Sequence, residues 1–237
     1  MATPAVQAAA GPVSRPDQGG PPLGVLGVVV TALFIAGLVL GTVLADGTPF
    51  PSPFGDAAQI VAYFQDHELA VRVGGTLQFA AAIPLAIYAA TASARLHRLG
   101  IRAPGATIAL AGGLLAAAFM AFSGLVSWTL SQPAATTDPE VIRLLQLLAF
   151  ATGGPGHVVP LGLLLAGIAV PGLLAGLLPR WLAWAGLTIA AVAELATLGL
   201  LLEPATYLLP VARFTALAWL ITAGFKLPLH RRSGTTT

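Results

Sequence analysis

The stretch Leu144–Leu178, LLQLLAFATGGPGHVVPLGLLLAGIAVPGLLAGLL, runs for 35 residues without a charged side chain. A continuous helix of this length would measure about 50 Å, against about 30 Å for the hydrocarbon core of a bilayer. The stretch is therefore too long for one membrane crossing and barely long enough for two. Because Gly-Gly-Pro-Gly at 153–156 interrupts it, we expect an apolar helix at 141–152 and a crossing at 157–178. The first of these would lie at the outer membrane surface or in an overhanging extension.

The composition of the whole chain is that of an integral membrane protein. Of its 237 residues, 57% are hydrophobic and 8% are charged, whereas soluble domains carry about 25% charged residues. This balance excludes a soluble enzyme of this size. The absence of cysteine excludes disulfides, thiolate metal sites, iron–sulfur clusters and cysteine nucleophiles.

Upstream of the long apolar stretch, the chain begins with a tail and an uncharged run. Residues 1–22 are rich in Pro, Gly and Ala, which predicts a disordered tail. The run 23–45 ends in Val43-Leu44-Ala45, which resembles a signal-peptide cleavage site. This run has 23 residues, whereas the apolar h-region of a signal peptide typically has about 7–15. We therefore favour a retained span.

The segment between the first two predicted spans contains a loop and a short helix. Gly47 to Pro53 holds three prolines, which prevents regular helix. From Asp56 to Asp66 apolar residues recur at helical spacing, which predicts an interfacial helix. Asp56 suits the positive N-terminal end of that helix.

The remaining apolar segments complete an all-α, polytopic six-helix transmembrane bundle. It forms one membrane domain, 23–228, followed by a cytoplasmic tail at 229–237. The predicted spans are 23–45, 70–94, 105–130, 157–178, 181–202 and 207–227.

Charged residues divide between the two sides of this bundle. Lys and Arg in short loops stay cytoplasmic, so the distribution places both termini in the cytoplasm. Two crossings within 144–178 would instead move Arg180 and Lys226 outside. The basic side holds Arg15, Arg95, Arg98, Arg102, Arg180, Lys226, Arg231 and Arg232 against Asp17 alone. The other side holds Asp46, Asp56, Asp66, Glu68, Asp138, Glu140 and Glu203, with Arg72 and Arg143 at its span edges.

Two ionisable residues fall within predicted spans. Glu194 lies 14 residues after Arg180, and Arg213 lies 13 residues before Lys226. Both are therefore about 20 Å from the cytoplasmic boundary, on consecutive helices. Equal depth predicts an intramembrane ion pair. The pair would either join two helices or form a polar functional site in the outer half.

Five more polar residues are predicted near the same level and form a candidate pocket of cationic character. Such a pocket would suit a carboxylate, a phosphate or a lipid head group. Taken singly, Arg72 and Arg143 would snorkel to the interface, and His157 would be a helix-end or core histidine. The five are Arg72, Gln78, His157, Arg143 and Gln146.

No pattern of catalytic residues or metal ligands emerges from the sequence. Paired intramembrane histidines are needed for haem between spans, and only His157 falls within one. Gly-Gly-Pro-Gly at 153–156 follows no strand and lacks the Lys-Ser/Thr of a phosphate loop. We therefore predict no catalytic residues, no bound metal and no cofactor. The basic residues form no soluble patch, so nucleic acid is not an expected partner.

Three local features carry a family resemblance. They are His67-Glu68-Leu69-Ala70-Val71-Arg72-Val73-Gly74-Gly75 before the second span, Arg95-Leu96-His97-Arg98-Leu99-Gly100 after it, and Gly176-Leu177-Leu178-Pro179-Arg180-Trp181-Leu182-Ala183-Trp184-Ala185-Gly186 at the fifth. The layout resembles the uncharacterised bacterial multi-span membrane proteins of the DUF4386 type, over about residues 23–228. The resemblance implies six helices and no established activity. The Ala, Gly, Pro and Arg bias is typical of a high-GC bacterium.

Three classes of function remain open from the sequence. The first is a non-enzymatic accessory, partner-binding or small-molecule-sensing subunit of a bacterial plasma membrane. The second is a small transporter with Glu194 and Arg213 in a water-accessible cavity. The third, and least favoured, is a membrane-embedded enzyme. Besides the lipid bilayer, the expected partners are other membrane proteins or a small anionic ligand.

Overall fold

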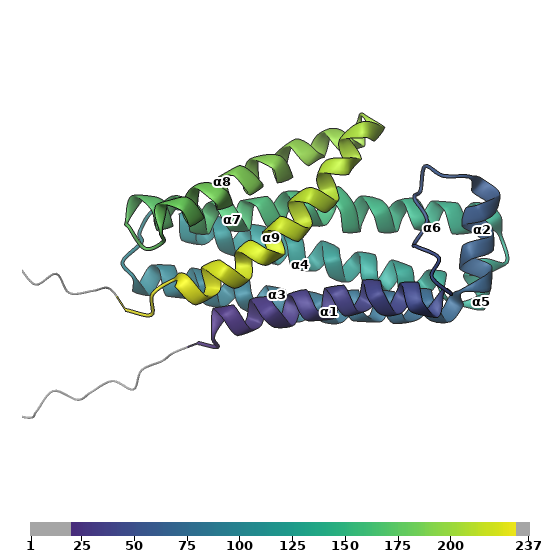
Figure 1. Ribbon diagram of the computed structural model, residues 1–237, viewed down its shortest axis with the longest axis horizontal. Coiled ribbons are helices and arrows are strands. Elements are labelled where there is room, and N and C mark those ends of the chain that lie inside the picture. Colours follow the sequence, from purple (N-terminus) through teal and green to yellow (C-terminus); the bar gives the residue numbers. More distant parts are fainter. Residues whose placement is uncertain (1–19, 231–237) are drawn as a thin grey trace, which may run out of the picture.

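The computed structural model describes residues 20–230, in which helices and loops occur but no strand (Figure 1). The predicted tails, 1–22 and 229–237, lie outside this part of the chain except for the few residues next to the bundle. The elements are α1 (Leu23–Leu44), α2 (Ala57–Asp66), α3 (Glu68–Arg98), α4 (Gly105–Leu130), α5 (Pro133–Thr136), α6 (Pro139–Ala151), η1 (Thr152–Gly156), α7 (His157–Leu174), α8 (Arg180–Leu195), η2 (Ala196–Leu200), η3 (Glu203–Tyr207) and α9 (Leu208–Lys226).

Six helical segments are long and apolar enough to cross a membrane, which confirms the predicted all-α bundle. Their exposed surfaces are covered with Val, Leu, Ile and Phe side chains, as contact with lipid requires. The six segments are Leu23–Leu44, Glu68–Arg98, Gly105–Leu130, Pro139–Leu174, Arg180–Leu200 and Glu203–Lys226.

The beginning of α1 and the end of α9 lie together at one end of the bundle, here called the terminal end (Figure 1). The opposite end, called the distal end, carries α2 and α5. α1 packs against α3 and α9, so it is an integral helix of the bundle.

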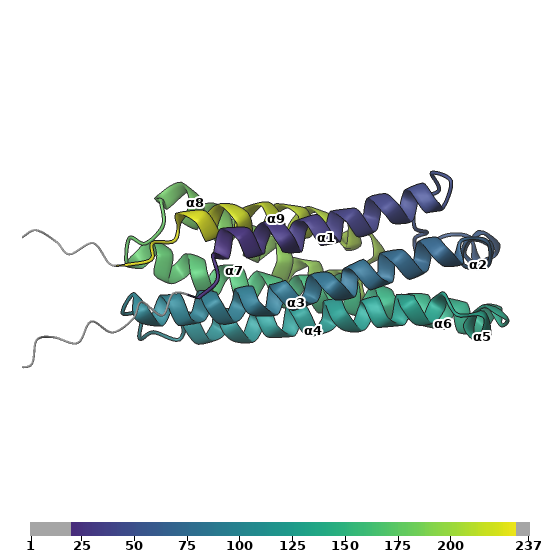
Figure 2. The same ribbon diagram turned by 90° about the horizontal axis from the view of Figure 1, so that it is seen from below.

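The long uncharged stretch forms a single kinked column of α6, η1 and α7. These three elements follow one another along the bundle, and α6 extends beyond the tip of the α8–α9 hairpin (Figures 1 and 2). Residues 141–152 therefore continue the line of α7 past this hairpin. The break is confined to one π-helical turn at Thr152–Gly156, where the chain kinks at Gly154 and then continues along the bundle as α7.

The predicted interfacial helix is present as α2. It begins where the Asp56 carboxylate accepts a hydrogen bond from the backbone N–H of Gln59, at 3.0 Å. This is an N-cap, which satisfies one of the unpaired N–H groups of the first turn. Ile60 and Phe64 are buried beneath the helix, in contact with α3 and α6.

Glycines hold α1 close to α9 near the terminal end. A Cβ atom at Gly27 would lie 3.1 Å from the backbone of Ile221, and one at Gly224 would lie 2.7 Å from the backbone of Leu23. Small residues of this kind allow membrane helices to approach at backbone distance. Towards the distal end α1 and α9 diverge (Figure 1), and residues of both helices line a pocket there.

Candidate functional site

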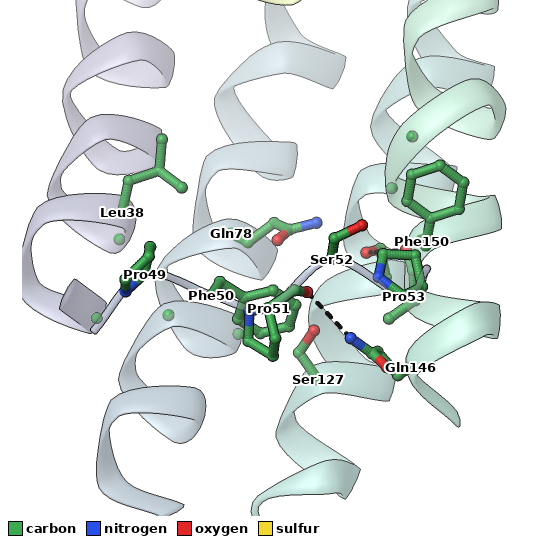
Figure 3. A pocket seen from close by; sticks show the side chains of 18 of the residues that line it. Leu38, Pro49, Phe50, Pro51, Ser52, Pro53, Gln78, Ser127, Gln146 and Phe150 are labelled. Atoms are coloured by element: carbon green, nitrogen blue, oxygen red, sulfur yellow. Dashed lines mark hydrogen bonds between the residues drawn. The ribbon is translucent and has the colours of Figure 1, made fainter. Parts of the chain in front are cut away.

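A pocket of about 550 Å³ opens in the distal half of the bundle. Its walls come from α1, α3, α4, the α6–η1 junction and α9, and the loop 49–54 covers it (Figure 3). Its volume is in the range of ligand sites for small molecules. The side chains that line it are mostly apolar, and they include Phe34, Leu38, Phe50, Phe54, Tyr63, Phe150, Leu209 and Phe214.

The covering loop is fixed by one polar contact and several aromatic ones. The side-chain amide of Gln146 donates a hydrogen bond to the carbonyl oxygen of Pro51, at 3.0 Å (Figure 3). The Phe50 ring meets Phe64 edge-on at 5.5 Å between centroids, and Phe54 meets Phe150 at 5.4 Å. Three prolines stiffen the loop, so little conformational entropy is lost in keeping it over the pocket.

Burial raises the pKa of Tyr63, the ionisable residue beneath this loop. Tyr63 on α2 lies against Phe50 and Phe64. Desolvation raises the pKa of its hydroxyl group above the usual 10, because the charged form is disfavoured away from water. Tyr63 is therefore neutral at physiological pH and contributes a polar but uncharged group.

The floor of the pocket is polar. Ser123 and Ser127 lie one turn apart on α4, and Gln78 faces them from α3. The Ser123 hydroxyl donates to the carbonyl oxygen of Ala149 at 2.9 Å, whereas Ser127 makes no hydrogen bond within residues 20–230. The Gln78 amide donates a long hydrogen bond to the Met120 carbonyl oxygen, at 3.5 Å, and keeps a second N–H for another acceptor. The Ser127 hydroxyl and this second N–H are thus groups that a ligand can reach.

Arg213 supplies the positive charge of the floor. Its guanidinium group lies 5.3 Å from the centroid of the Phe34 ring, and one Nη atom donates to the carbonyl oxygen of Gly153. The buried Nε atom has no partner, and within the described residues Arg213 forms no ion pair. A charge in this apolar setting is costly unless an anion, water or dipole stabilises it.

The acceptor for Arg213 comes from the helix break. Gly154 has non-helical backbone angles, φ −81° and ψ −105°, and Pro155 has no N–H to donate. The sequence Gly-Gly-Pro-Gly therefore opens the helical hydrogen-bond pattern and turns the Gly153 carbonyl towards α9. Gly153 must also be small, because a Cβ atom there would clash with the Ser123 side chain.

The predicted ion pair between Glu194 and Arg213 is not formed. Glu194 is exposed on α8 and lies beside Gly162 of α7, where an added Cβ would be 3.4 Å from a carboxylate oxygen. Depth along the bundle does not by itself decide contact, because each side chain must also point towards the other from its helix. The side chains buried in the bundle at this level are Ala193 of α8 and Ala196 of η2.

We expect Glu194→Gln and Arg213→Gln to change stability independently. Contacting residues show interaction energies above about 0.5 kcal/mol in double-mutant cycles, whereas separated ones add within that limit. The measurement is thermal unfolding of wild type, both single variants and the double variant in one detergent. A coupling energy of about 1 kcal/mol or more would mean that the two residues do meet.

Two of the five residues predicted for the outer-half pocket are correctly placed. Gln78 and Gln146 line the cavity. Arg72 instead points to the distal surface, where it donates to the backbone oxygen of Ser131 at 3.1 Å, and Arg143 is exposed on α6. These two positions agree with the alternative interpretation of interfacial arginines.

His157 is also outside the pocket. It is buried between α4 and α7, where its Nδ1 atom lies 2.9 Å from the Ala116 carbonyl oxygen. Its Nε2 atom has no partner within residues 20–230. The prediction of a pocket residue is wrong here because the π-helical turn rotates the first residue of α7 towards α4; the alternative of a core histidine is right.

Several lining residues were not identified from the sequence. Ser123 and Ser127 are four residues apart in an apolar span, and this spacing on one helix face was a usable signal. The loop 49–54 was recognised only as a stretch that prevents helix formation. Its folding back over the bundle depends on long-range contacts with Gln146 and Phe150, which no local pattern reveals.

Potential metal ligands are not clustered in the described part of the chain. No three His, Asp or Glu side chains there are arranged to hold an ion. Among the lining residues, the ionisable side chains are Arg213 and Tyr63. The chemistry of this set is hydrogen bonding and charge attraction towards an anion.

Comparison with known proteins adds no further constraint: no family model, curated protein or solved structure matches the chain. The resemblance to proteins of the DUF4386 type stays a prediction. Functional inference therefore depends on the pocket itself.

Proposed function

We propose that this protein is a non-enzymatic, multi-pass membrane subunit that binds a small molecule carrying one acidic group. The observation that carries this proposal is the pocket of about 550 Å³ with the Arg213 guanidinium in its floor. Binding would make the protein a sensor or an accessory subunit for that molecule. We further propose that it is a bacterial plasma membrane protein of the DUF4386 type with cytoplasmic termini, so that the pocket faces outward.

Electrostatics favours an anion as the ligand. Arg213 has one backbone carbonyl as its hydrogen-bond acceptor and an aromatic ring beside it. Hydrogen bonds between an arginine and a carboxylate or similar anion are shorter and stronger than neutral ones. In an apolar pocket they are weakened less by solvent than at a protein surface.

The lining supports binding rather than catalysis. General acid–base and nucleophilic catalysis need a nucleophile within hydrogen-bond reach of a base. The hydroxyls nearest the floor, Ser123 and Ser127, have no histidine or carboxylate among the lining residues beside them. What the lining does offer is a cation, an amide and a hydroxyl around an apolar volume.

The natural absence of cysteine makes a direct occupancy test possible. In the full chain in phosphatidylcholine nanodiscs, Ser127→Cys introduces a single thiol in the pocket. We expect octanesulfonate to slow the reaction of this thiol with N-ethylmaleimide, and octyltrimethylammonium to have no effect. Adding Arg213→Gln should raise the half-protecting concentration of octanesulfonate at least about tenfold, since a charged hydrogen bond is lost.

The matched control is Thr129→Cys, two positions along α4, exposed and outside the lining. Octanesulfonate should not alter its labelling. Equal protection by the anion and the cation, or protection that survives Arg213→Gln unchanged, would refute the proposal.

A transporter is the second candidate, and the helix break favours it. Interrupted membrane helices with free backbone carbonyls line the substrate sites of many transporters, and η1 places the Gly153 carbonyl in this pocket. Glu194, the other residue expected in a transport cavity, is absent from the lining. Uptake of octanesulfonate into proteoliposomes, abolished by Arg213→Gln, would assign transport; binding without uptake would assign sensing.

A further inference from the structure

We infer that the ligand is a single-chain amphiphile with a carboxylate head, and that it enters the pocket sideways from the bilayer between α1 and α9. This inference rests on the proposed function, because it names the chemical class of the ligand and its route. The opening is called the α1–α9 window and is defined by Leu38 of α1 and by Pro210 and Phe214 of α9.

The window follows from how the two helices cross. They are joined by glycine contacts near the terminal end, and Figure 1 shows them separating towards the distal end. The rings of Phe34 and Phe214, 6.2 Å apart, close the narrow end of the gap. Beyond them, Leu38 lines the pocket and is 44% exposed, as is Phe214.

The side of the pocket towards the distal end is covered. The loop 49–54 lies across it, held by the Gln146–Pro51 hydrogen bond and by the contacts of Phe50 and Phe54 (Figure 3). A route through this cover requires these contacts to break. A route through the window passes only apolar surface that is already exposed on the lipid-facing side.

The charge of the floor selects the head group. One guanidinium group faces the pocket, and the other lining groups are neutral at physiological pH. A carboxylate carries a single negative charge, whereas a phosphate monoester carries about −1.5 to −2 near neutrality. A monocarboxylate is therefore neutralised by Arg213, with Gln78 and Ser127 available as further donors, while a phosphate monoester would leave excess charge in an apolar site.

The window also allows a ligand with a long alkyl chain to fit. Once the head group contacts Arg213, the first part of the chain lies along Phe34, Leu38 and Phe214, and the remainder extends through the window into lipid. Moving a methylene from lipid to an apolar pocket changes its surroundings little. Affinity expressed per mole of lipid should therefore depend weakly on chain length.

The alkyl chain length of the ligand distinguishes a pocket that opens to lipid through the window from a closed pocket. Half-protection of Ser127→Cys is measured in nanodiscs with decanoate, dodecanoate, tetradecanoate and octadecanoate, each expressed as a mole fraction of lipid. We expect the four values to agree within about threefold, because the extra methylenes stay in apolar surroundings. A loss of affinity of about tenfold or more for octadecanoate would indicate a closed pocket and overturn the inference.

The route is tested by partly blocking the window. Leu38→Trp places a large ring at its edge, and Val39→Trp places the same ring on the neighbouring exposed position outside the lining. We expect Leu38→Trp to slow the onset of dodecanoate protection about tenfold or more, as when binding requires a conformational change, and Val39→Trp to leave it unchanged. Equal onset rates in both variants would exclude this route.

The head group is tested at constant chain length. Dodecanoate should protect at least about tenfold better than dodecyl phosphate or dodecanol, and only dodecanoate should weaken on adding Arg213→Gln by that factor. Protection by octanesulfonate without protection by dodecanoate would overturn this inference and leave the proposed function standing. Protection by neither would overturn both.

Discussion

Replacing Trp219 with alanine should lower the free energy of unfolding by about 3 kcal/mol, near the lower end for deletion of a buried tryptophan. Trp219 is 3% exposed, and its ring lies directly against Gly186 of α8. Its Nε1–H donates to the carbonyl oxygen of Leu182 at 2.8 Å. Because lipid is as apolar as the protein interior, most of this loss would come from packing contacts and the cavity left between α8 and α9.

Two further variants separate these contributions. Trp219→Phe removes the hydrogen bond and keeps most of the ring volume, so a loss of about 1 kcal/mol is expected. Trp184→Ala deletes the same side chain from the exposed face of α8, where Trp184 is 60% exposed, and should change stability by less than about 0.5 kcal/mol. The measurement is reversible unfolding in mixed micelles; equal losses at positions 184 and 219 would contradict the packing of α8 on α9.

Replacing Gly167 with alanine should lower the free energy of unfolding by about 1–3 kcal/mol, although alanine favours helix by up to about 1 kcal/mol. A Cβ atom at Gly167 of α7 would lie 2.7 Å from the Cα of Ala109 and 2.7 Å from the carbonyl oxygen of Gly105. Both contacts are with the backbone of α4. The two helices would therefore have to move apart along their whole interface.

The matched control for this variant is Gly74→Ala. Gly74 is also inside a helix, and the nearest atom to an added Cβ is the carbonyl oxygen of Gly37, at 3.7 Å. That is an ordinary contact distance, so the control should retain or gain stability. A destabilised Gly74→Ala together with an unaffected Gly167→Ala would mean that α4 and α7 are not in backbone contact.

The number of spans was predictable because the bilayer imposes one strong requirement. Every crossing needs about 20 apolar residues, and this chain contains six such segments. The Gly-Gly-Pro-Gly break was visible in the sequence as well. Its conformation was not, since a π-helical turn that keeps α6 in line with α7 depends on the neighbours packed around Gly153 and Gly156.

The candidate site was less predictable than the spans. The position of a residue along the bundle is easier to infer from the sequence than the direction in which its side chain points. Counting residues from charged boundaries placed Arg213, Gln78 and Gln146 in one half of the bundle, and all three line the pocket. The same counting placed Glu194 and His157 at that level, but their side chains leave the helix axes in other directions. Successive side chains on a helix are rotated by about 100° about its axis. A shift of one residue is therefore enough to turn a side chain from the pocket to the lipid-facing surface.

The contact between α1 and α9 sets the stage of synthesis at which α1 can complete its packing. Chains emerge from the ribosome N-terminus first, so the glycine-lined face of α1 stays uncovered until α9 has been made. Arg213 belongs to that last helix. A polypeptide that ends before α9 would thus lack Arg213 and would leave the glycine-lined face of α1 uncovered.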